Sequence, residues 1–155
     1  MIQKRYIEGL DFYRLAEFYK DDKNHLKCKV TPNEEQRMDG DSRHYIYAHY
    51  VNDELVYIGE SSDLVKRRMN FYCCHPGITN ERVRKHFNEE FKKKPSSDIC
   101  TFIHMPEKIV VSETITVNPY VAIEQTLISM LKPKLNRKDV FRKRPRKYTR
   151  KKFNR

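Results

Sequence analysis

Tryptophan is absent from this 155-residue chain, and glycine and cysteine occur only four times each. Four irregularly spaced cysteines are too few for a disulfide framework, so we expect reduced thiols, as in a cytoplasm. No apolar run approaches the roughly 20 residues that cross a bilayer, and residues 1–6 lack the apolar segment of a secretory signal. These absences argue against membrane and secreted proteins and favour a cytoplasmic one.

Acidic residues are almost missing from the C-terminal end of the chain. Of the net charge of +11, residues 137–155 hold eleven Lys or Arg and one acid, which leaves +10 there and +1 on residues 1–136. A segment that repels itself so strongly cannot fold alone, and the aromatic rings among its cations suit base stacking beside phosphate contact. We expect a disordered tail that binds nucleic acid, or alternatively one that serves solubility or localisation. The expected contacts are Arg142, Lys143, Arg144, Arg146 and Lys147.

The first half of the chain contains two different periodicities. Apolar residues between Ile7 and Phe18 recur near helical spacing, which predicts a helix over 7–19 within an N-terminal helical extension, residues 1–42. Residues 45–51 and 55–58 are rich in β-forming side chains and are separated by the turn residues Asn52 and Asp53. They predict an antiparallel hairpin.

The second half predicts further helices and strands. Helices are expected from a cap at Ser61, Ser62 or Asp63 to about Cys73, over 81–93, and from Asn118-Pro119 to about Leu131. Residues 99–104 alternate like a strand, and 108–117 favour another. The expected fold is α+β: a small central antiparallel sheet of about three strands flanked by helices in a domain of residues 43–136, with 137–155 as the basic tail.

Three segments contain residues that could take part in catalysis or binding. The hairpin carries Tyr47 and Tyr57 and leads into Gly59, and a basic stretch, Lys66-Arg67-Arg68, lies on the next predicted helix. Glu124 is a single acid among apolar residues on the last helix, where an unpaired charge is costly unless a metal or an arginine compensates it. Taken alone, the tyrosines are equally consistent with core packing, and Glu124 with an exposed helix face.

The order of these residues resembles the GIY-YIG nuclease domain over about residues 43–136. Nine residues separate Tyr45-Ile46-Tyr47 from Tyr57-Ile58-Gly59, which is followed by Arg67 eight residues after the glycine, and much later by Glu124 and Asn136. The spacing from the Tyr-Ile-Gly tripeptide to an arginine on a helix makes this resemblance specific. It implies a metal-dependent endonuclease that hydrolyses DNA phosphodiester bonds.

The resemblance assigns a role to each matching position. Tyr47 and Tyr57 match the tyrosines whose hydroxyls handle the proton of the attacking water, and Gly59 matches the glycine that lets the strand end pass close to the site. Arg67 matches the arginine that holds the scissile phosphate. Glu124 matches the acid that ligates one divalent metal ion.

Two positions depart from the family pattern. Tyr45 replaces the first glycine, which contributes no side chain to the chemistry. Phe71 lies four residues after Arg67, where relatives often have His or Tyr, and it cannot transfer a proton. We expect His86 or Lys85 as candidates for that auxiliary role, with a solvent-facing His86 as the alternative. Asn136 matches a supporting asparagine that orders the site.

Glu124 as the only available acid implies one metal ion, Mg²⁺ or Mn²⁺, because Mg²⁺ accepts one carboxylate and keeps most of its waters. A tyrosine acting as a base needs its pKa lowered from about 10, and we expect Arg67 and the metal to lower it. Lys66 and Arg68 are expected to contact the DNA backbone.

The resemblance also implies partners. We expect double-stranded DNA, and a phage-encoded enzyme that acts on host or unmodified DNA in the host cytoplasm. One site cuts one strand, so double-strand cleavage requires a dimer or tetramer, with residues 1–43 as interface material. The alternatives are a site-specific homing or restriction-type endonuclease and a DNA-binding module with a decayed site. The presence of all five matched residues disfavours decay.

Overall fold

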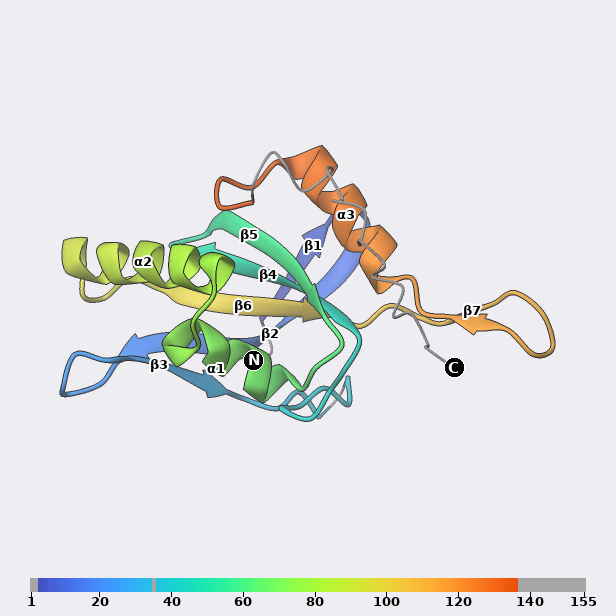
Figure 1. Ribbon diagram of the computed structural model, residues 1–155, viewed down its shortest axis with the longest axis horizontal. Coiled ribbons are helices and arrows are strands. Elements are labelled where there is room, and N and C mark those ends of the chain that lie inside the picture. The colour runs from blue at the N-terminus through green and yellow to red at the C-terminus, as the bar shows by residue number, and fades with distance from the viewer. Residues whose placement is uncertain (1–2, 35, 137–155) are drawn as a thin grey trace, which may run out of the picture.

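A computed structural model describes residues 3–34 and 36–136 of the chain (Figure 1). One antiparallel sheet has the strand order β1-β2-β6-β4-β5, and β3 pairs with β2 beside it. The strands of this sheet are β1 Lys4–Ile7, β2 Leu10–Lys20, β3 Leu26–Val30, β4 Tyr45–Val51, β5 Glu54–Ser61 and β6 Ile99–His104. The helices are α1 Val65–Cys74, α2 Ile78–Lys93 and α3 Tyr120–Leu131, and a separate ribbon is formed by β7 Ile109–Val110 and β8 Thr116–Val117.

The predicted hairpin is confirmed as β4 and β5. Its two turn residues, Asn52 and Asp53, have positive φ angles of 47° and 70°, the conformation that a two-residue turn matching the twist of the strands needs. Every residue of β4 is buried, because β4 lies between β5 and β6 and both of its faces are covered. The sequence of a strand that is buried on both faces is typically a continuous run of apolar and aromatic residues, as in β4.

The sheet separates two layers of helix (Figure 1). Successive side chains of a strand point to opposite faces. Tyr45 and Tyr47 therefore join the core that includes Met69 and Tyr72 of α1 and Phe87 of α2. The residues that alternate with them along β4, Ile46, Ala48 and Tyr50, face the other way. They join a smaller core that includes Leu127 and Ile128 of α3. This arrangement puts α1 and α3 on opposite sides of the β4–β5 hairpin.

The helix predicted over residues 7–19 is wrong. Ile7 ends β1, and from Leu10 onward the residues form β2, which pairs with β1, β3 and β6. The sheet therefore has six strands rather than about three, and the N-terminal residues are not a helical extension. A bulge between Arg14 and Ala16 explains the error. It changes the phase of the alternation, so Phe12 enters the α3-side core while Leu15 and Ala16 both enter the other. The resulting apolar spacing resembles that of a helix.

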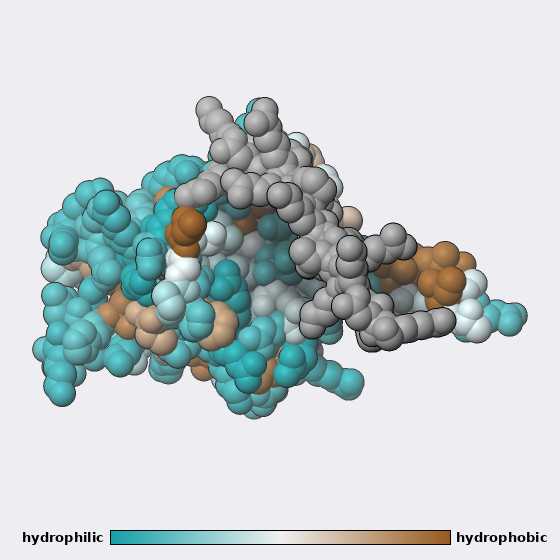
Figure 2. All heavy atoms as spheres, in the orientation of Figure 1, coloured by the Kyte–Doolittle hydropathy of each residue, from teal (hydrophilic) through white to brown (hydrophobic). Residues whose placement is uncertain are grey.

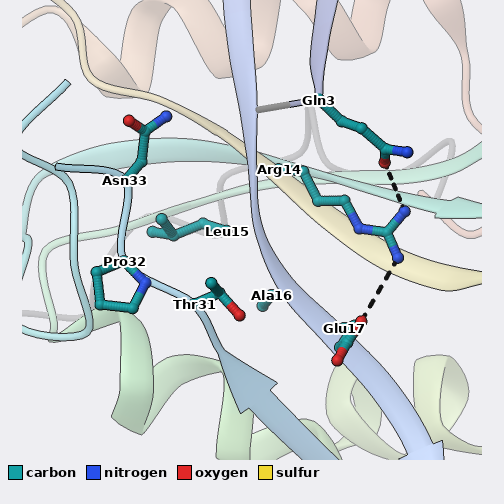
Figure 3. Close-up of a pocket in the computed structure, with 8 residues that line it drawn as sticks. All are labelled: Gln3, Arg14, Leu15, Ala16, Glu17, Thr31, Pro32 and Asn33. Carbon is teal, nitrogen blue, oxygen red and sulfur yellow. Dashed lines mark hydrogen bonds and ion pairs between the residues drawn. The ribbon is translucent and has the colours of Figure 1, made fainter. Parts of the chain in front are cut away.

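The bulge also lies beside a hollow of about 440 Å³ (Figure 3). The Arg14 guanidinium donates hydrogen bonds to the Gln3 side chain at 2.7 Å and to the Asp98 carboxylate at 2.8 Å. The positive charge of Arg14 at the bulge is therefore compensated by Asp98. Neither Tyr47 nor Tyr57 is among the residues that line this hollow.

The other three predicted helices are confirmed, with small differences at their ends. The N-cap of α1 is Leu64 and has no side-chain cap; instead, the Asp63 carboxylate accepts the Leu64 amide at 2.8 Å. α2 begins at Ile78, three residues before the prediction, and Pro119 is the N-cap of α3. The segment 108–117 forms the β7–β8 ribbon instead of one strand. Within the described ranges, no helix is long and apolar enough to span a membrane.

Candidate active site

Gly59 lies under the rings of two tyrosines. It is the register partner of Tyr47 across the hairpin. A Cβ atom at Gly59 would lie 2.5 Å from the Tyr47 hydroxyl oxygen and 2.8 Å from Cε1 of Tyr57. Any side chain here would displace at least one ring, so the close packing of Tyr47 and Tyr57 itself requires the glycine.

The Arg68 guanidinium organises the polar part of this cluster. Its Nε donates to the Tyr47 hydroxyl at 3.0 Å, and one terminal nitrogen donates to the Tyr72 hydroxyl at 2.8 Å. The other terminal nitrogen donates to the amide oxygen of Asn80, on α2, at 3.0 Å. The guanidinium also lies 4.6 Å from the centre of the Tyr72 ring, a cation–π distance. Arg68 is thus held in one orientation by groups from β4, α1 and α2.

The two hydroxyls of the cluster share one short hydrogen bond. The oxygen atoms of Tyr47 and Tyr72 are 2.6 Å apart, and either can be the donor. Both oxygens already accept from Arg68, so the bond between them uses one of their two hydrogens. The second hydroxyl hydrogen is not used inside this trio, and Tyr57 is a neighbouring partner, because a hydrogen bond with Tyr72 acts on the pKa of its hydroxyl.

Arg67, the arginine selected by the sequence spacing, is not brought into this cluster. Its side chain is 58% exposed, and its guanidinium pairs with Asp63 at 3.3 Å. The inward face of α1 is formed by Val65, Met69 and Tyr72. Position 68 shares this face through the i, i+3, i+4, i+7 spacing, whereas position 67 lies about 100° away around the helix.

Tyr72 is a residue that the sequence reasoning missed. It lies four residues after Arg68, so the departure at Phe71 disappears when the pattern is counted from Arg68 instead of Arg67. The available signal was the helical stripe: position 72 follows Val65 and Met69 at core spacing, and both are fully buried.

His86 and Lys85 lie away from the cluster. His86 is half-buried on α2, where burial and the neighbouring Lys134 lower its pKa. Lys85 is exposed and pairs with Glu89 on its own helix at 4.0 Å. No contact of either residue with Tyr47, Tyr72 or Arg68 exists among the hydrogen bonds of the described residues.

Burial raises the pKa values of the tyrosines instead of lowering them. Tyr47 is fully buried and Tyr57 is 8% exposed, and desolvation is the largest cause of the raised pKa of each hydroxyl. The positive charge of Arg68 acts in the opposite direction without overcoming it. The charge of Arg68 therefore does not provide the lowered tyrosine pKa that a base would need, and both groups are protonated at neutral pH.

Glu124 lies on α3, which packs against β5 and β4. Of the tyrosines, its charge acts on Tyr57. The Glu124 carboxyl group is half-buried, and desolvation together with repulsion from Glu60 raises its pKa to about 7. Among the described residues, the Glu124 carboxylate forms no hydrogen bond or ion pair. Glu60, the residue directly after Gly59, also has a raised pKa because of burial, which the charge of Arg68 partly offsets. The sequence reasoning missed Glu60.

Two carboxylates that repel each other in a partly buried place suit a divalent cation. Carboxylate oxygens are the ligands that Mg²⁺ accepts, and it usually takes one or two of them while keeping several waters. No cluster of three or more His, Cys, Asp or Glu side chains with metal-binding geometry occurs in residues 3–34 and 36–136. Glu124, with Glu60 beside it, therefore fits a single hydrated Mg²⁺ ion.

Asn136 secures the edge strand of the site. Its side-chain oxygen accepts the Ile58 amide at 3.0 Å, and its side-chain nitrogen donates to the Ile58 carbonyl at 2.7 Å. Leu135 adds a backbone hydrogen bond to Val56 at 2.9 Å. These three bonds hold β5 on either side of Tyr57.

The remaining predicted DNA contacts lie outside the cluster. Lys66 is on the solvent side of α1 and pairs with Asp41 at 2.5 Å. The basic tail lies outside the described residues, and with it Arg142, Lys143, Arg144, Arg146 and Lys147.

Comparison with solved structures shows a shared fold. A mutant of EndoII from bacteriophage T4 superposes with a TM-score of 0.62 at 21% sequence identity, over 81% of this chain and 92% of that chain. The restriction endonuclease Hpy188I, solved with product DNA, gives a TM-score of 0.42 at 14% identity over 77% and 75%. The second likeness is too weak to carry an argument. No protein-family model and no curated protein matches the sequence.

Proposed function

We propose that the protein is a metal-dependent DNA endonuclease of the GIY-YIG type. The observation that carries the proposal is the hydrogen-bonded trio of Tyr47, Tyr72 and Arg68 beside Gly59, with the Glu124 carboxyl group near enough to Tyr57 to raise the pKa of its hydroxyl. The fold shared with phage T4 EndoII supports it, as does the likeness of residues 52–59 to endonuclease II of T-even phages.

Arg68 is the group that grips the scissile phosphate in this proposal, in place of Arg67. A guanidinium has five N–H donors, and Tyr47, Tyr72 and Asn80 take three of them, one on each nitrogen. One donor remains on each terminal nitrogen, and these two can bind two non-bridging oxygens in a bidentate contact. Because Arg68 is fixed before the substrate arrives, little reorganisation is needed as negative charge develops on the phosphate.

Glu124 would hold the metal ion, with Glu60 beside it. A bound Mg²⁺ or Mn²⁺ would neutralise negative charge on the leaving side of the phosphate. The protein residues retain the other tasks: Glu124 provides a ligand whose carboxyl group must lose its proton first, and Asn136 keeps β5 in position beneath the tyrosines.

The tyrosines position the attacking water. Because burial keeps Tyr47 and Tyr57 protonated, their hydroxyls are suited to hydrogen-bond the water and hold it in line with the phosphate, and not to act as preformed phenolates. His86 has no place in this arrangement.

In this proposal, exposed cations contact the DNA backbone beyond the scissile phosphate. Arg67 and Lys66 lie on the outer face of α1 next to the cluster, where they can contact neighbouring phosphates of double-stranded DNA. The basic tail would add contacts that do not depend on base sequence. By the resemblance to the T-even phage enzyme, the target is host or unmodified DNA, cut as a dimer or higher oligomer.

Cleavage of supercoiled plasmid tests the proposal. We expect nicking by the purified chain with Mg²⁺, none with EDTA, and none by Glu124→Gln. Arg67→Gln is the matched control for Arg68→Gln: both remove one positive charge from the same helix, and only Arg68→Gln removes the phosphate grip. A chain that binds DNA but cuts no plasmid with Mg²⁺ or Mn²⁺ would contradict the proposal and favour a DNA-binding module.

A further inference from the structure

A cavity of about 530 Å³ lies between the β2–β3 turn, the C-terminal end of α1 and α2. Figure 2, in the orientation of Figure 1, shows that the surface at this left-hand end of the molecule is mostly hydrophilic. The lining includes three cations and three side-chain amides: Lys20, Lys27, Arg84, Asn24, Asn70 and Asn88. None of the described residues that line the cavity is acidic.

The Lys20 ammonium group is held at the cavity by neutral oxygen atoms. It donates to the backbone carbonyl of Asn24 at 3.0 Å and to the side-chain oxygen of Asn88, on α2, at 2.5 Å. No carboxylate of the described residues forms an ion pair with it, and its side chain is half-buried. A partly desolvated cation with only neutral partners is stabilised further when an anion binds beside it.

The other two cations are also incompletely compensated. Arg84 donates to the backbone carbonyl of His75, just after α1, at 3.2 Å. Lys27 is 50% exposed and lies 3.9 Å from the Asp21 carboxylate, which also accepts two backbone amides of its own turn. Residues 1–136 have a net charge of only +1. Three cations around one cavity, without an acid in its lining, are therefore a local concentration of positive charge.

Cations combined with side-chain amides suit a phosphate group. Lys, Arg and Asn side chains are common donors to phosphate oxygens in complexes with DNA. The side-chain oxygen of Asn88 accepts from Lys20, which leaves the Asn88 amide nitrogen as a donor. The amide nitrogen of Asn70 has only a weak contact with the Cys74 sulfur at 3.6 Å among the described residues. Both amides can therefore donate to a phosphate without adding charge.

Helix α2 connects this cavity to the candidate active site. Asn80, Arg84 and Asn88 are spaced by four residues, so their side chains follow one stripe along the helix. Asn80 accepts the Arg68 guanidinium at 3.0 Å, whereas Arg84 and Asn88 line the cavity. Eight residues of helix span about 12 Å. The cavity therefore lies a short distance along the same helix from the proposed phosphate grip.

We propose that this cavity is a second phosphate-binding site, which holds a backbone phosphate of the DNA strand or duplex whose scissile phosphate lies at Arg68. Lys20 and Arg84 supply the charge, and Asn70 and Asn88 supply amide donors. The proposal rests on the proposed function, because it takes DNA as the ligand. Contacts to phosphates carry no sequence information, so this site adds affinity and fixes the orientation of the duplex for every sequence alike. Unlike the basic tail, it is built by the folded domain.

Binding of a short duplex to the full chain in EDTA tests the proposal, since a metal-dependent enzyme does not cut under these conditions. Fluorescence anisotropy at several salt concentrations gives the slope of log affinity against log salt. Lys20→Gln and Arg84→Gln should each flatten this slope by about 0.9, and the double variant by roughly 2. Lys23→Gln and Lys85→Gln are the matched controls, because each removes an exposed cation next to Asn24 or Arg84 that does not line the cavity. Their slopes should equal that of the wild type.

A third variant guards against a loss of folding. Asn70→Asp keeps the shape of an exposed side chain and places a carboxylate in the cavity. It should weaken duplex binding about fivefold, as expected for two like charges a few ångström apart in water. Circular dichroism and the melting temperature should match the wild type for this variant.

The possible outcomes separate this site from the nuclease function. Wild-type slopes for both Lys20→Gln and Arg84→Gln overturn the proposal, and plasmid nicking by the same chain would leave the nuclease function standing. Flattened slopes in a chain that cuts no DNA support the site and contradict the nuclease function. Equal flattening by the two control variants shows a diffuse basic surface and overturns the proposal. If inorganic phosphate alone shifts the NMR signal of the Asn88 side-chain amide while all slopes stay at the wild-type value, the ligand is a free phosphate compound, and the assignment to DNA is wrong.

Discussion

The two sides of the candidate site differ in how their charges are compensated. On the α1 side, the Arg68 guanidinium has hydrogen-bond partners on all three nitrogens. On the α3 side, burial raises the pKa values of both Glu124 and Glu60, and repulsion from Glu60 raises that of Glu124 further. One side is held together by its own hydrogen bonds, whereas the other leaves two carboxyl groups uncompensated. If the proposed function holds, the phosphate-binding side is organised before the substrate arrives, and the metal-binding side would be stabilised by the cation that it binds.

The α3 side gives the largest predicted effect. Glu124→Gln keeps the shape of the side chain and removes the charge that holds the cation. We expect cleavage to fall by at least about 10³-fold, since a loss of charge stabilisation in the transition state appears in turnover. Binding to a short duplex, measured by fluorescence anisotropy in EDTA, should remain close to wild type. Normal plasmid nicking by this variant at low Mg²⁺ would show that the α3 side is not the metal site.

The α1 side is tested by two neighbouring arginines. Arg68→Lys replaces a planar fork with a point charge that cannot bind Tyr47, Tyr72, Asn80 and a phosphate at once, so we expect a loss of at least about 10²-fold in turnover. Arg67→Lys should change turnover less than about threefold, because among the described residues Arg67 pairs with Asp63 at the surface and with no member of the cluster. Single-turnover rates on an oligonucleotide duplex measure both. The reverse ranking would return the phosphate role to Arg67.

Gly59 lies on β5 against the rings of Tyr47 and Tyr57, and its substitution should lower the stability of the protein as well as its activity. Gly59→Ala places a methyl group against the Tyr47 and Tyr57 rings, and overpacking of this kind costs about 1–3 kcal/mol. We expect urea unfolding to show this loss of stability, with a parallel loss of cleavage. Gly9→Ala is unsuitable as a control because Gly9 has a φ of 84°, whereas Gly40→Ala meets only the flexible Lys66 side chain and should cost less. Equal stability of Gly59→Ala and wild type would mean that the rings move freely.

The repulsion between the carboxyl groups predicts a pH dependence. The pKa of Glu124 is about 7 in the metal-free chain, so below that pH a proton competes with the cation, and the apparent Mg²⁺ affinity should rise as the pH increases through 7. Glu60→Gln removes one cause of the raised pKa, so the metal-free pKa of Glu124 should move down toward its ordinary value. Carbon-13 NMR titration of the Glu side chains measures this shift. An unchanged Glu124 pKa would show that the two groups do not interact.

The basic tail belongs to neither side, and its removal should have the smallest effect on turnover. Each phosphate contact contributes about 0.9 to the slope of log affinity against log salt. If about half of the eleven cations in residues 137–155 bind phosphates, deletion of the tail should flatten that slope by roughly 4–5. Turnover on a saturating short duplex should change little. Equal slopes for both proteins would show that the tail does not contact DNA, and a collapse of turnover would place part of it in the site.

The sequence by itself determined those features whose signals are local. The β4–β5 hairpin followed from two β-forming runs and a two-residue turn, and the three helices from caps, prolines and apolar spacing. Tyr47, Tyr57 and Gly59 were selected from the resemblance, and the hairpin register, which pairs Tyr47 with Gly59, gives a physical reason why these residues lie together. Asn136 was selected from the resemblance alone, and its contact with Ile58 supplies a physical reason for that position.

The tertiary structure decided the features that depend on long-range pairing or on rotation about a helix axis. β2 is a strand because β6, more than eighty residues away, pairs with it, and the bulge at Arg14 gives its sequence a helical appearance. Arg68 and not Arg67 enters the cluster because the start of α1 sets which face of the helix meets the sheet. Glu60 raises the pKa of Glu124 because α3 packs against β5. Local propensity carries no information about such encounters, since their free energy exists only once distant segments of the chain are packed together.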